Sequence, residues 1–366
     1  MSAPADTTQT VRKIGAARHR RGRSVLLGCG IVSLIGVVAG IIFGPLSISL
    51  AELFAILGDK VGFETADGLS PTKIGVVENL RIPRTLLGFS VGAALGAAGA
   101  TMQGFFRNPL ADPALIGVSS GGAFAAVAVI VFGASGFGAI SSILGAFTLP
   151  LTAFLGALLS VFVIYQISTF DGRVIVATML LAGVAANALA YSGIGYLTFL
   201  ADDAQLRDLT FWTLGSLAGA TWAKVLPSTL LMGIATLGLL RLSRPMNCLL
   251  LGEADAETLG INVERVKGQA ALFTALGVGA ATASCGIIAF VGLVTPHLVR
   301  LMTGPDHRFV LPGSALLGAT LILFADLIAR LSVAPAELPL GVVTAALGAP
   351  FFFWLLLKDK RIESLG

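Results

Sequence analysis

The chain has 366 residues, of which 55% are hydrophobic and only 12% are charged. Soluble globular proteins carry about 25% charged residues, so this composition excludes a chain whose whole surface faces water. The 45 glycines fit closely packed membrane helices. The composition predicts an all-α integral membrane protein surrounded by lipid, with no nucleic acid as a partner.

The N-terminal 24 residues are basic and precede an apolar run at residues 25–43. A cleaved signal peptide would end at a small-residue cleavage site, and none follows this run. We therefore expect a cytoplasmic basic tail at residues 1–24 and a retained first helix. A single transmembrane domain is expected at 25–358, followed by a cytoplasmic tail at 359–366.

Ten apolar segments are candidates for membrane spans, since about 20 apolar residues cross a bilayer. In chain order they cover residues 25–45, 86–106, 114–132, 144–167, 174–200, 225–242, 268–288, 288–302, 311–330 and 341–357.

Two of these regions are interrupted by helix-breaking residues. Residues 267–302 are too long for one span and contain Gly286, Gly292 and Pro296, which predicts one full helix and one short, broken return. A similar break at residues 108–113 follows the second span. One break in each half of the chain suggests an inverted internal repeat.

The distribution of positive charge predicts the orientation. With the N-terminus inside, most of the 24 Lys and Arg residues fall on the cytoplasmic side. An even number of spans then leaves both termini in the cytoplasm of a multi-pass protein of the cell membrane.

Residues 251–266 form a polar segment between the sixth and seventh spans, on the cytoplasmic side. Acidic residues lead and basic residues follow, and Gly260 is expected to end a first short helix. Leu251 and Leu259 supply an apolar side. The segment is either a connector or a docking element for a cytoplasmic partner.

Three arginines are predicted on the outer side, where positive charge is disfavoured: Arg81, Arg84 and Arg330. Each could be an interfacial anchor. Pro83 stiffens the turn between the first two, and together the three would suit carboxylates of an external protein. Asp326 lies four residues before Arg330, as an i,i+4 partner or as an intramembrane ion site.

The chain lacks a Gly-Lys dipeptide and therefore the P-loop that cradles ATP phosphates. The three Cys and three His residues show no metal-ligand spacing. No cofactor is expected on this chain, so ATP and Mg²⁺ would be bound by a separate ATPase, and the chain is not itself an enzyme.

Several motifs occur together in one order: Arg81-Ile82-Pro83-Arg84, a run from Met102 to Pro113, Gly117-Val118-Ser119-Ser120-Gly121, Leu251-Gly252, Gly292-Leu293-Val294-Thr295-Pro296-His297 and Glu337-Leu338-Pro339-Leu340-Gly341. In these motifs the chain, from about residue 50 to 358, resembles the iron-siderophore, haem and vitamin B12 permeases of ABC importers, the FecCD/BtuC type.

The resemblance implies ten helices per subunit, a homodimer around a central pore, two cytoplasmic ATP-binding subunits and an external binding protein, either a lipoprotein or a periplasmic protein. It assigns Arg81, Arg84 and Arg330 to docking of the binding protein. It assigns residues 251–266 to ATPase coupling and implies pore or gate positions on the second and fifth helices. The coupling residues are Leu251, Gly252, Glu253, Ala256, Leu259 and Gly260, and the pore or gate residues are Gln103, Asn187 and Tyr191.

The substrate is the least constrained part of the prediction. The runs 117–122 and 211–217 look most like the haem branch, so haem is preferred over ferric siderophore or cobalamin. Asn187 and Tyr191 could equally be hydrogen-bonding contacts between helices. An ion-coupled secondary transporter is the rival class, which would rest on Asp326, and a passive channel is a second rival.

Overall fold

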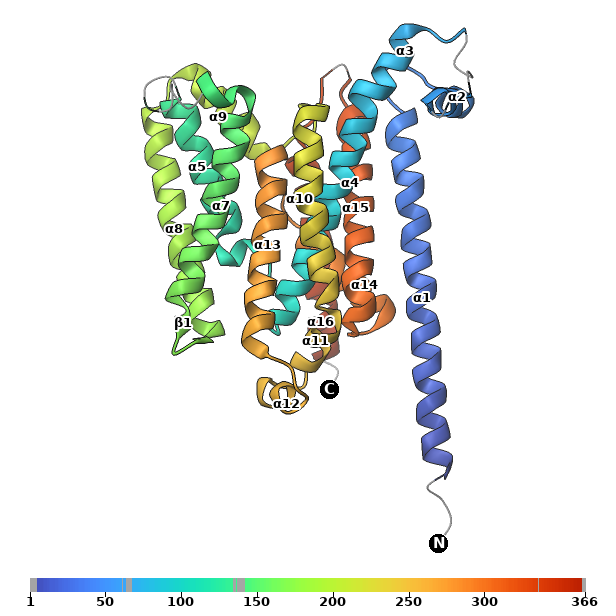
Figure 1. Ribbon diagram of the computed structural model, residues 1–366, viewed down its shortest axis with the longest axis vertical. Coiled ribbons are helices and arrows are strands. Elements are labelled where there is room, and N and C mark those ends of the chain that lie inside the picture. Colours follow the sequence, from blue (N-terminus) through green and yellow to red (C-terminus); the bar gives the residue numbers. More distant parts are fainter. Residues whose placement is uncertain are drawn as a thin grey trace.

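In the computed structural model the chain folds into a bundle of helices lying along one direction (Figure 1). The structure describes residues 5–60, 62–63, 68–133, 136, 142–334 and 336–363. The last three residues of the predicted C-terminal tail lie outside these ranges. The all-α prediction is confirmed, with one small exception: the antiparallel hairpin of β1 (Thr169–Phe170) and β2 (Arg173–Val174).

Each of the ten predicted spans contains a helix. In chain order these are α1 (Ala5–Ile42), α4 (Ile82–Phe105), α5 (Val118–Phe132), α7 (Thr148–Ile167), α8 (Val176–Leu200), α10 (Trp222–Arg241), α13 (Val263–Cys285), α14 (Val291–Thr303), α15 (His307–Leu331) and α16 (Leu340–Glu363).

Length and composition make six helical segments of the described chain suitable for crossing a membrane: 15–42, 71–105, 142–167, 176–200, 222–241 and 307–331. The number of crossings, ten, therefore stays a prediction. A break is present in both predicted regions, but in the first of them only Gly286 marks it, since Gly292 and Pro296 lie inside the continuous helix α14. Residues 286–290 separate α13 from α14, and residues 106–112 separate α4 from the 3₁₀ turn η2 (Pro113–Ile116).

Shorter elements complete the two ends of the bundle. They are α2 (Leu50–Lys60), α3 (Pro71–Val76), the π-helical turn η1 (Val77–Arg81), the 3₁₀ turn η3 (Gly145–Phe147), α9 (Asp203–Leu214), α11 (Ser243–Leu249) and α12 (Glu253–Thr258).

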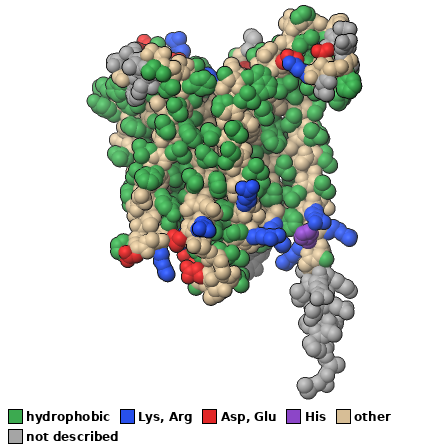
Figure 2. All heavy atoms as spheres, in the orientation of Figure 1, with side chains coloured by type: hydrophobic (Ala, Val, Ile, Leu, Met, Phe, Trp, Pro, Cys, Tyr) green, Lys and Arg blue, Asp and Glu red, His purple; other side chains and the backbone are tan. Residues whose placement is uncertain are grey.

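The two ends can be told apart by these elements. One end, called the α12 end, holds α12, the β hairpin, the start of α1 and the end of α16 (Figure 1). The opposite end, called the α9 end, holds α2, α3 and α9. Charged side chains gather toward the two ends on the face shown in Figure 2, and the middle band is mostly apolar, as lipid contact requires.

Helix α4 is the centre of the bundle, and its glycines explain why. A Cβ added at Gly92 would lie 2.2 Å from the carbonyl oxygen of Gly318 on α15, and one at Gly96 would lie 2.0 Å from that of Ser314. A Cβ added at Gly99 would lie 1.8 Å from the carbonyl oxygen of Gly292 on α14. Small residues spaced three or four apart let backbones touch, which is the main attraction between helices in lipid.

The packing of α4 predicts the effect of filling one of these contacts. Gly96→Val should lower the thermal stability of the detergent-solubilised protein strongly, because overpacking a tight core costs about 1–3 kcal/mol even where the backbone can shift. Gly28→Val on α1 is the matched control, since nothing lies within 4 Å of a Cβ there. Equal melting temperatures for the two variants would contradict this account of the core.

Candidate functional site

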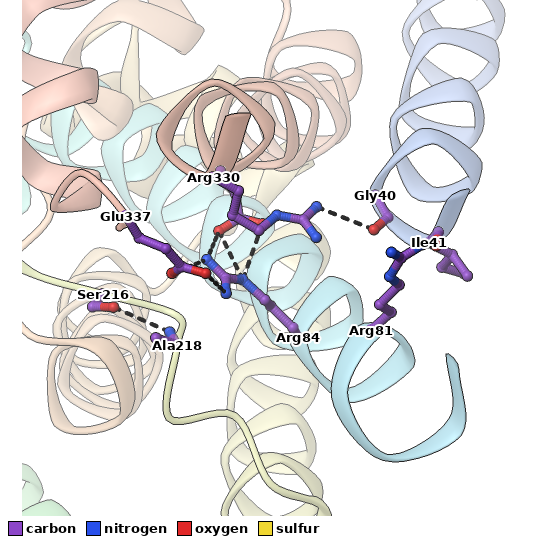
Figure 3. Close-up of polar contacts among 9 residues, drawn as sticks. Gly40, Ile41, Arg81, Arg84, Ser216, Ala218, Arg330 and Glu337 are labelled. Carbon is purple, nitrogen blue, oxygen red and sulfur yellow. Dashed lines mark hydrogen bonds and ion pairs between the residues drawn. The ribbon is translucent and has the colours of Figure 1, made fainter. Parts of the chain in front are cut away.

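The three predicted outer arginines lie together at the α9 end, but they are engaged inside the chain (Figure 3). The π-helical turn η1 runs directly into α4 and brings Arg81 and Arg84 to this end. Pro83 has no backbone N–H to donate inside this helix, and a π turn beside it adjusts the hydrogen bonds. Pro83 therefore marks the irregular turn, although its π geometry is not predictable from Pro83 alone.

Arg81 closes the end of helix α1. Its Nη1 donates to the carbonyl oxygens of Ile41 at 2.8 Å and Ile42 at 2.6 Å, and its Nη2 donates to that of Leu46. The last carbonyls of a helix have no partner within the helix, so this guanidinium satisfies them in place of water. Arg81 is 4% exposed, and a Cβ at residue 44 would lie 2.7 Å from its Nη2, so Gly44 leaves room for the guanidinium in this position.

Arg84 binds two carboxylates at once. Its Nε and Nη2 donate to Asp326 on α15, at 2.8 Å for the shortest contact, and its Nη1 and Nη2 each donate to Glu337 at 2.8 Å. Bidentate pairs of this kind are among the strongest polar contacts in proteins. The Asp326 side chain is 6% exposed, whereas that of Glu337 is 36% exposed, so Glu337 is the outer member of the cluster.

Arg330 shares Asp326 with Arg84. Its Nε lies 3.1 Å from Asp326 Oδ2, and its Nη2 donates to the carbonyl oxygen of Gly40 on α1. The i,i+4 interpretation of Asp326 and Arg330 is confirmed. The cluster therefore joins α1, α4, α15 and the loop before α16.

The predicted coupling segment at the α12 end has a well-defined frame. The N–H of Gly260 donates to Glu257 O at 2.9 Å, and the N–H of Ile261 donates to Ala256 O at 3.0 Å. With Gly260 at φ +81°, these two bonds form the Schellman ending of α12, which confirms the predicted helix stop. Ala256, within α12, is fully buried and lies on the inner side of this helix.

Two apolar side chains protrude from this charged segment. Leu251 is 65% exposed and Leu259 is 60% exposed, and they flank α12 on both sides. The acidic side chains of α12 are exposed as well. Two protruding leucines beside a charged helix are what a protein partner would cover.

Buried Lys267 fixes the position of α12. Its Nζ donates to Glu253 at 2.8 Å, to Glu264 at 3.1 Å and to the carbonyl oxygen of Val174 at 3.0 Å. The Glu264 carboxylate accepts the N–H of Val174 at 2.7 Å, so the two side chains hold both backbone groups of that β2 residue. Glu253, one of the predicted coupling residues, is thus part of the frame of the segment.

A second polar contact at the α12 end centres on Asp306, which the sequence analysis did not single out. Partial burial favours the neutral carboxyl, yet hydrogen bonds from Arg308 and from Asn247 outweigh it and lower the pKa of Asp306 to about 2. Asn247 also accepts the N–H of His307 at 2.8 Å. These contacts tie α11 to the start of α15.

The predicted pore or gate residues lie in different surroundings. Gln103 is 2% exposed, donates to Leu293 O and accepts from Arg300 on α14. Asn187 accepts from Ser120 and donates to Ala114 O, so it joins α8 to α5 and η2. Tyr191, in contrast, is 57% exposed on α8. Of the three, only Tyr191 faces outward from the chain.

The described residues include no group of three or more His, Cys, Asp or Glu arranged to hold a metal ion. A family model described as the FecCD transport family matches residues 31–358. The chain belongs to the FecCD transport family. It is a membrane transport permease.

Individual relatives agree with this assignment. The chain is 45% identical to the hemin transport system permease protein HmuU of Yersinia pestis, over 78% of this chain and 84% of that protein. It is 41% identical to the cobalamin import system permease protein BtuC of Halobacterium salinarum, over 81% and 77%, and 38% identical to the vitamin B12 import system permease protein BtuC of Escherichia coli, over 85% and 93%.

A solved structure shares the fold. Its TM-score is 0.78 at 30% identity, with 92% of this chain and 99% of the other covered, and it is described as an inward-facing conformation of a metal-chelate type ABC transporter.

The role of Arg81 as a helix end cap can be tested directly. Arg81→Gln should lower the melting temperature of the purified protein, because three carbonyl oxygens lose a charged donor and bonds to charged groups contribute about 1.5–3 kcal/mol each. Arg207→Gln on α9 is the control, since no ion pair of Arg207 is found among the described residues. A melting temperature unchanged in Arg81→Gln would contradict the capping role.

Proposed function

We propose that this chain is the membrane-spanning subunit of an ABC importer that carries haem inward. The observation that carries the substrate class is the 45% identity to a hemin permease over 84% of that relative's length. The cobalamin permease of Halobacterium salinarum, at 41%, keeps cobalamin as the second candidate. A ferric siderophore is the third candidate within the same family.

Transport would be powered by two separate ATP-binding subunits at the α12 end. Support comes from the exposed Leu251 and Leu259 on either side of α12, whose position is fixed by the Lys267 contacts. The rest of the predicted coupling set, Gly252, Glu253, Ala256 and Gly260, shapes this element from within. In this proposal the α12 end, with both termini, faces the cytoplasm of the cell membrane.

An external binding protein, periplasmic or lipid-anchored, would dock at the α9 end. Among Arg81, Arg84 and Arg330, only Arg84 reaches the outer part of the cluster, through its pair with Glu337. We therefore place the main contact for a partner's carboxylate at Arg84. Arg81 and Arg330 would act through it, by adding positive charge and holding the neighbouring helices.

The pore would form between two copies of the chain, with α8 at the interface. Only 11% of the 18-residue apolar stretch of α8 that could cross the membrane is buried in the chain. The exposed side chains of α8 include Tyr191, Leu189 and Phe199. A second copy would cover this face, and Tyr191 would then line or close the pathway. Gln103 and Asn187 would instead keep the helices behind the pathway in place.

An ion-coupled mechanism finds less support in the geometry. It would rest on Asp326, and this carboxylate is held by the guanidinium groups of both Arg84 and Arg330. Both carboxylate oxygens of Asp326 are engaged in these ion pairs, which leaves no free carboxylate there to bind a coupling ion.

The proposed function predicts ATP-driven uptake of haem. Proteoliposomes containing the permease, its ATP-binding subunits and its binding protein should accumulate haem only with ATP, and vanadate should stop the uptake. Cyanocobalamin and a ferric siderophore serve as competitor substrates in the same vesicles. Uptake driven by a proton gradient without ATP would contradict the importer assignment, and preferred uptake of cobalamin would contradict the haem assignment.

The coupling surface predicts a second result. Leu259→Glu should abolish most of the ATPase binding, because a charge replaces an apolar side chain at the centre of the contact. The measurement is co-purification with the ATP-binding subunits and transport-coupled ATP hydrolysis. Phe170→Ser, which changes an exposed apolar side chain on the hairpin of the same end, is the control.

Leu259 is a better test position than Gly260. Gly260 has φ +81°, so any side chain there would strain the backbone whether or not a partner is present. Normal ATPase binding by Leu259→Glu would remove α12 from the proposed interface. A loss of binding shared equally with Phe170→Ser would mean that the contact is not centred on α12.

A further inference from the structure

The Arg84 cluster contains one carboxylate that is held differently from the other. Asp326 is buried and forms ion pairs with two guanidinium groups, whereas Glu337, among the residues that the structure describes, forms an ion pair with Arg84 alone and is partly open to solvent. The Arg84–Glu337 pair has the parallel two-bond geometry, with both Nη–Oε distances at 2.8 Å. Glu337 thus occupies the outward-facing edge of Arg84, where a carboxylate arriving from outside would bind.

The backbone that directly follows Glu337 is held in place by hydrogen bonds. The N–H of Leu338 donates to Ala329 O at 3.0 Å, and the N–H of Leu340 donates to Gly215 O at 2.9 Å. A Cβ at Gly341 would lie 2.5 Å from Leu214 O, so this stretch packs closely against the end of α9. The Glu337 side chain can therefore leave Arg84 by rotating about its own bonds, without unfolding the loop.

The charges of the cluster do not cancel. This region holds three guanidinium groups, of Arg81, Arg84 and Arg330, and two carboxylates, of Asp326 and Glu337, which pair with Arg84 and Arg330. Arg81 instead points toward α1 (Figure 3). Arg81 is bonded to carbonyl oxygens only, so one positive charge remains at this end of α4. An approaching acidic surface is attracted even while Glu337 occupies Arg84.

We propose that Glu337 is an internal substitute for the partner's carboxylate, and that docking of the binding protein exchanges one carboxylate for the other on Arg84. This inference rests on the proposed function, because it needs a partner with an exposed Glu or Asp. Before docking, Glu337 binds the outer edge of the mostly buried Arg84 guanidinium, whose inner edge is bound by Asp326. On docking, the incoming carboxylate takes over the bidentate contact and Glu337 turns to solvent.

The exchange sets the affinity of docking. Every docking event must first break the Arg84–Glu337 pair, so the observed affinity is lower than the new contact alone would give. A partly exposed ion pair contributes up to about 1 kcal/mol, which corresponds to about a fivefold change in Kd. A binding protein that must leave after delivering its substrate benefits from such competition.

The test compares Glu337→Gln and Glu337→Ala with the wild type, in the full complex with its ATP-binding subunits in nanodiscs. The probe is the substrate-binding protein that stimulates ATP hydrolysis by the wild-type complex. Both variants should bind it with a Kd about two- to fivefold lower, with a faster association rate and a steeper loss of affinity with salt, because an acidic competitor is gone. Glu78→Gln is the matched control, since Glu78 pairs with Lys60 on the same end of the molecule.

Arg84→Gln separates the two hypotheses. If Arg84→Gln weakens docking but both Glu337 variants bind as the wild type does, or more weakly, then carboxylate exchange is wrong while the docking site stands. If Arg84→Gln binds as tightly as the wild type, the docking site at Arg84 is wrong and the exchange fails with it. If Glu78→Gln gains affinity as the Glu337 variants do, the gain comes from removing any negative charge at this end of the molecule, and the exchange is wrong.

Discussion

The close backbone contact of α4 with α15 and α14 is the constraint on which the rest of the structure depends. Lipid tails are as apolar as the helices, so the hydrophobic effect does not drive helices together inside a membrane. Helix association therefore comes from tight packing and from polar contacts. Gly92, Gly96 and Gly99 let α4 approach its neighbours until backbones touch. The two functional ends of the chain are built on this one central helix.

Helix α4 carries polar contacts at both ends of its buried length. At the α9 end it holds Arg84 against Asp326 and Glu337, and at the other end it holds Gln103 against Arg300 of α14. A helix packed at van der Waals distance along its length moves as a unit with its neighbours. A binding event at Arg84 therefore acts on helix α4, which runs toward the α12 end, where the ATP-binding subunits are proposed to bind.

Most of the fold could be predicted from the sequence, because long apolar runs and helix breakers leave few alternatives. The break at Gly286 and the helix stop at Gly260 were both readable, since each glycine adopts a positive φ that other residues avoid. The π turn before Pro83, helix α9 and the hairpin at Thr169–Val174 were not predicted. Local signals for two of them stand in the sequence, since the Asp202–Gln205 capping box opens α9 and Asp171-Gly172 forms the turn of the hairpin. The bonds of Val174 to Glu264 and Lys267, which hold the hairpin in place, leave no local pattern.

The site was predicted as a group of residues, but their individual tasks were not. Buried polar groups inside a membrane protein must find partners within the chain. Arg81, Arg330, Gln103 and Asn187 stand out in an apolar sequence, and the structure binds all four internally. The groups that remain accessible to other molecules are the exposed leucines beside α12, Tyr191 on α8, and the edge of Arg84 that the partly exposed Glu337 covers. In such a chain, a charged motif marks where a site is built, and exposure decides which of its members meets the partner.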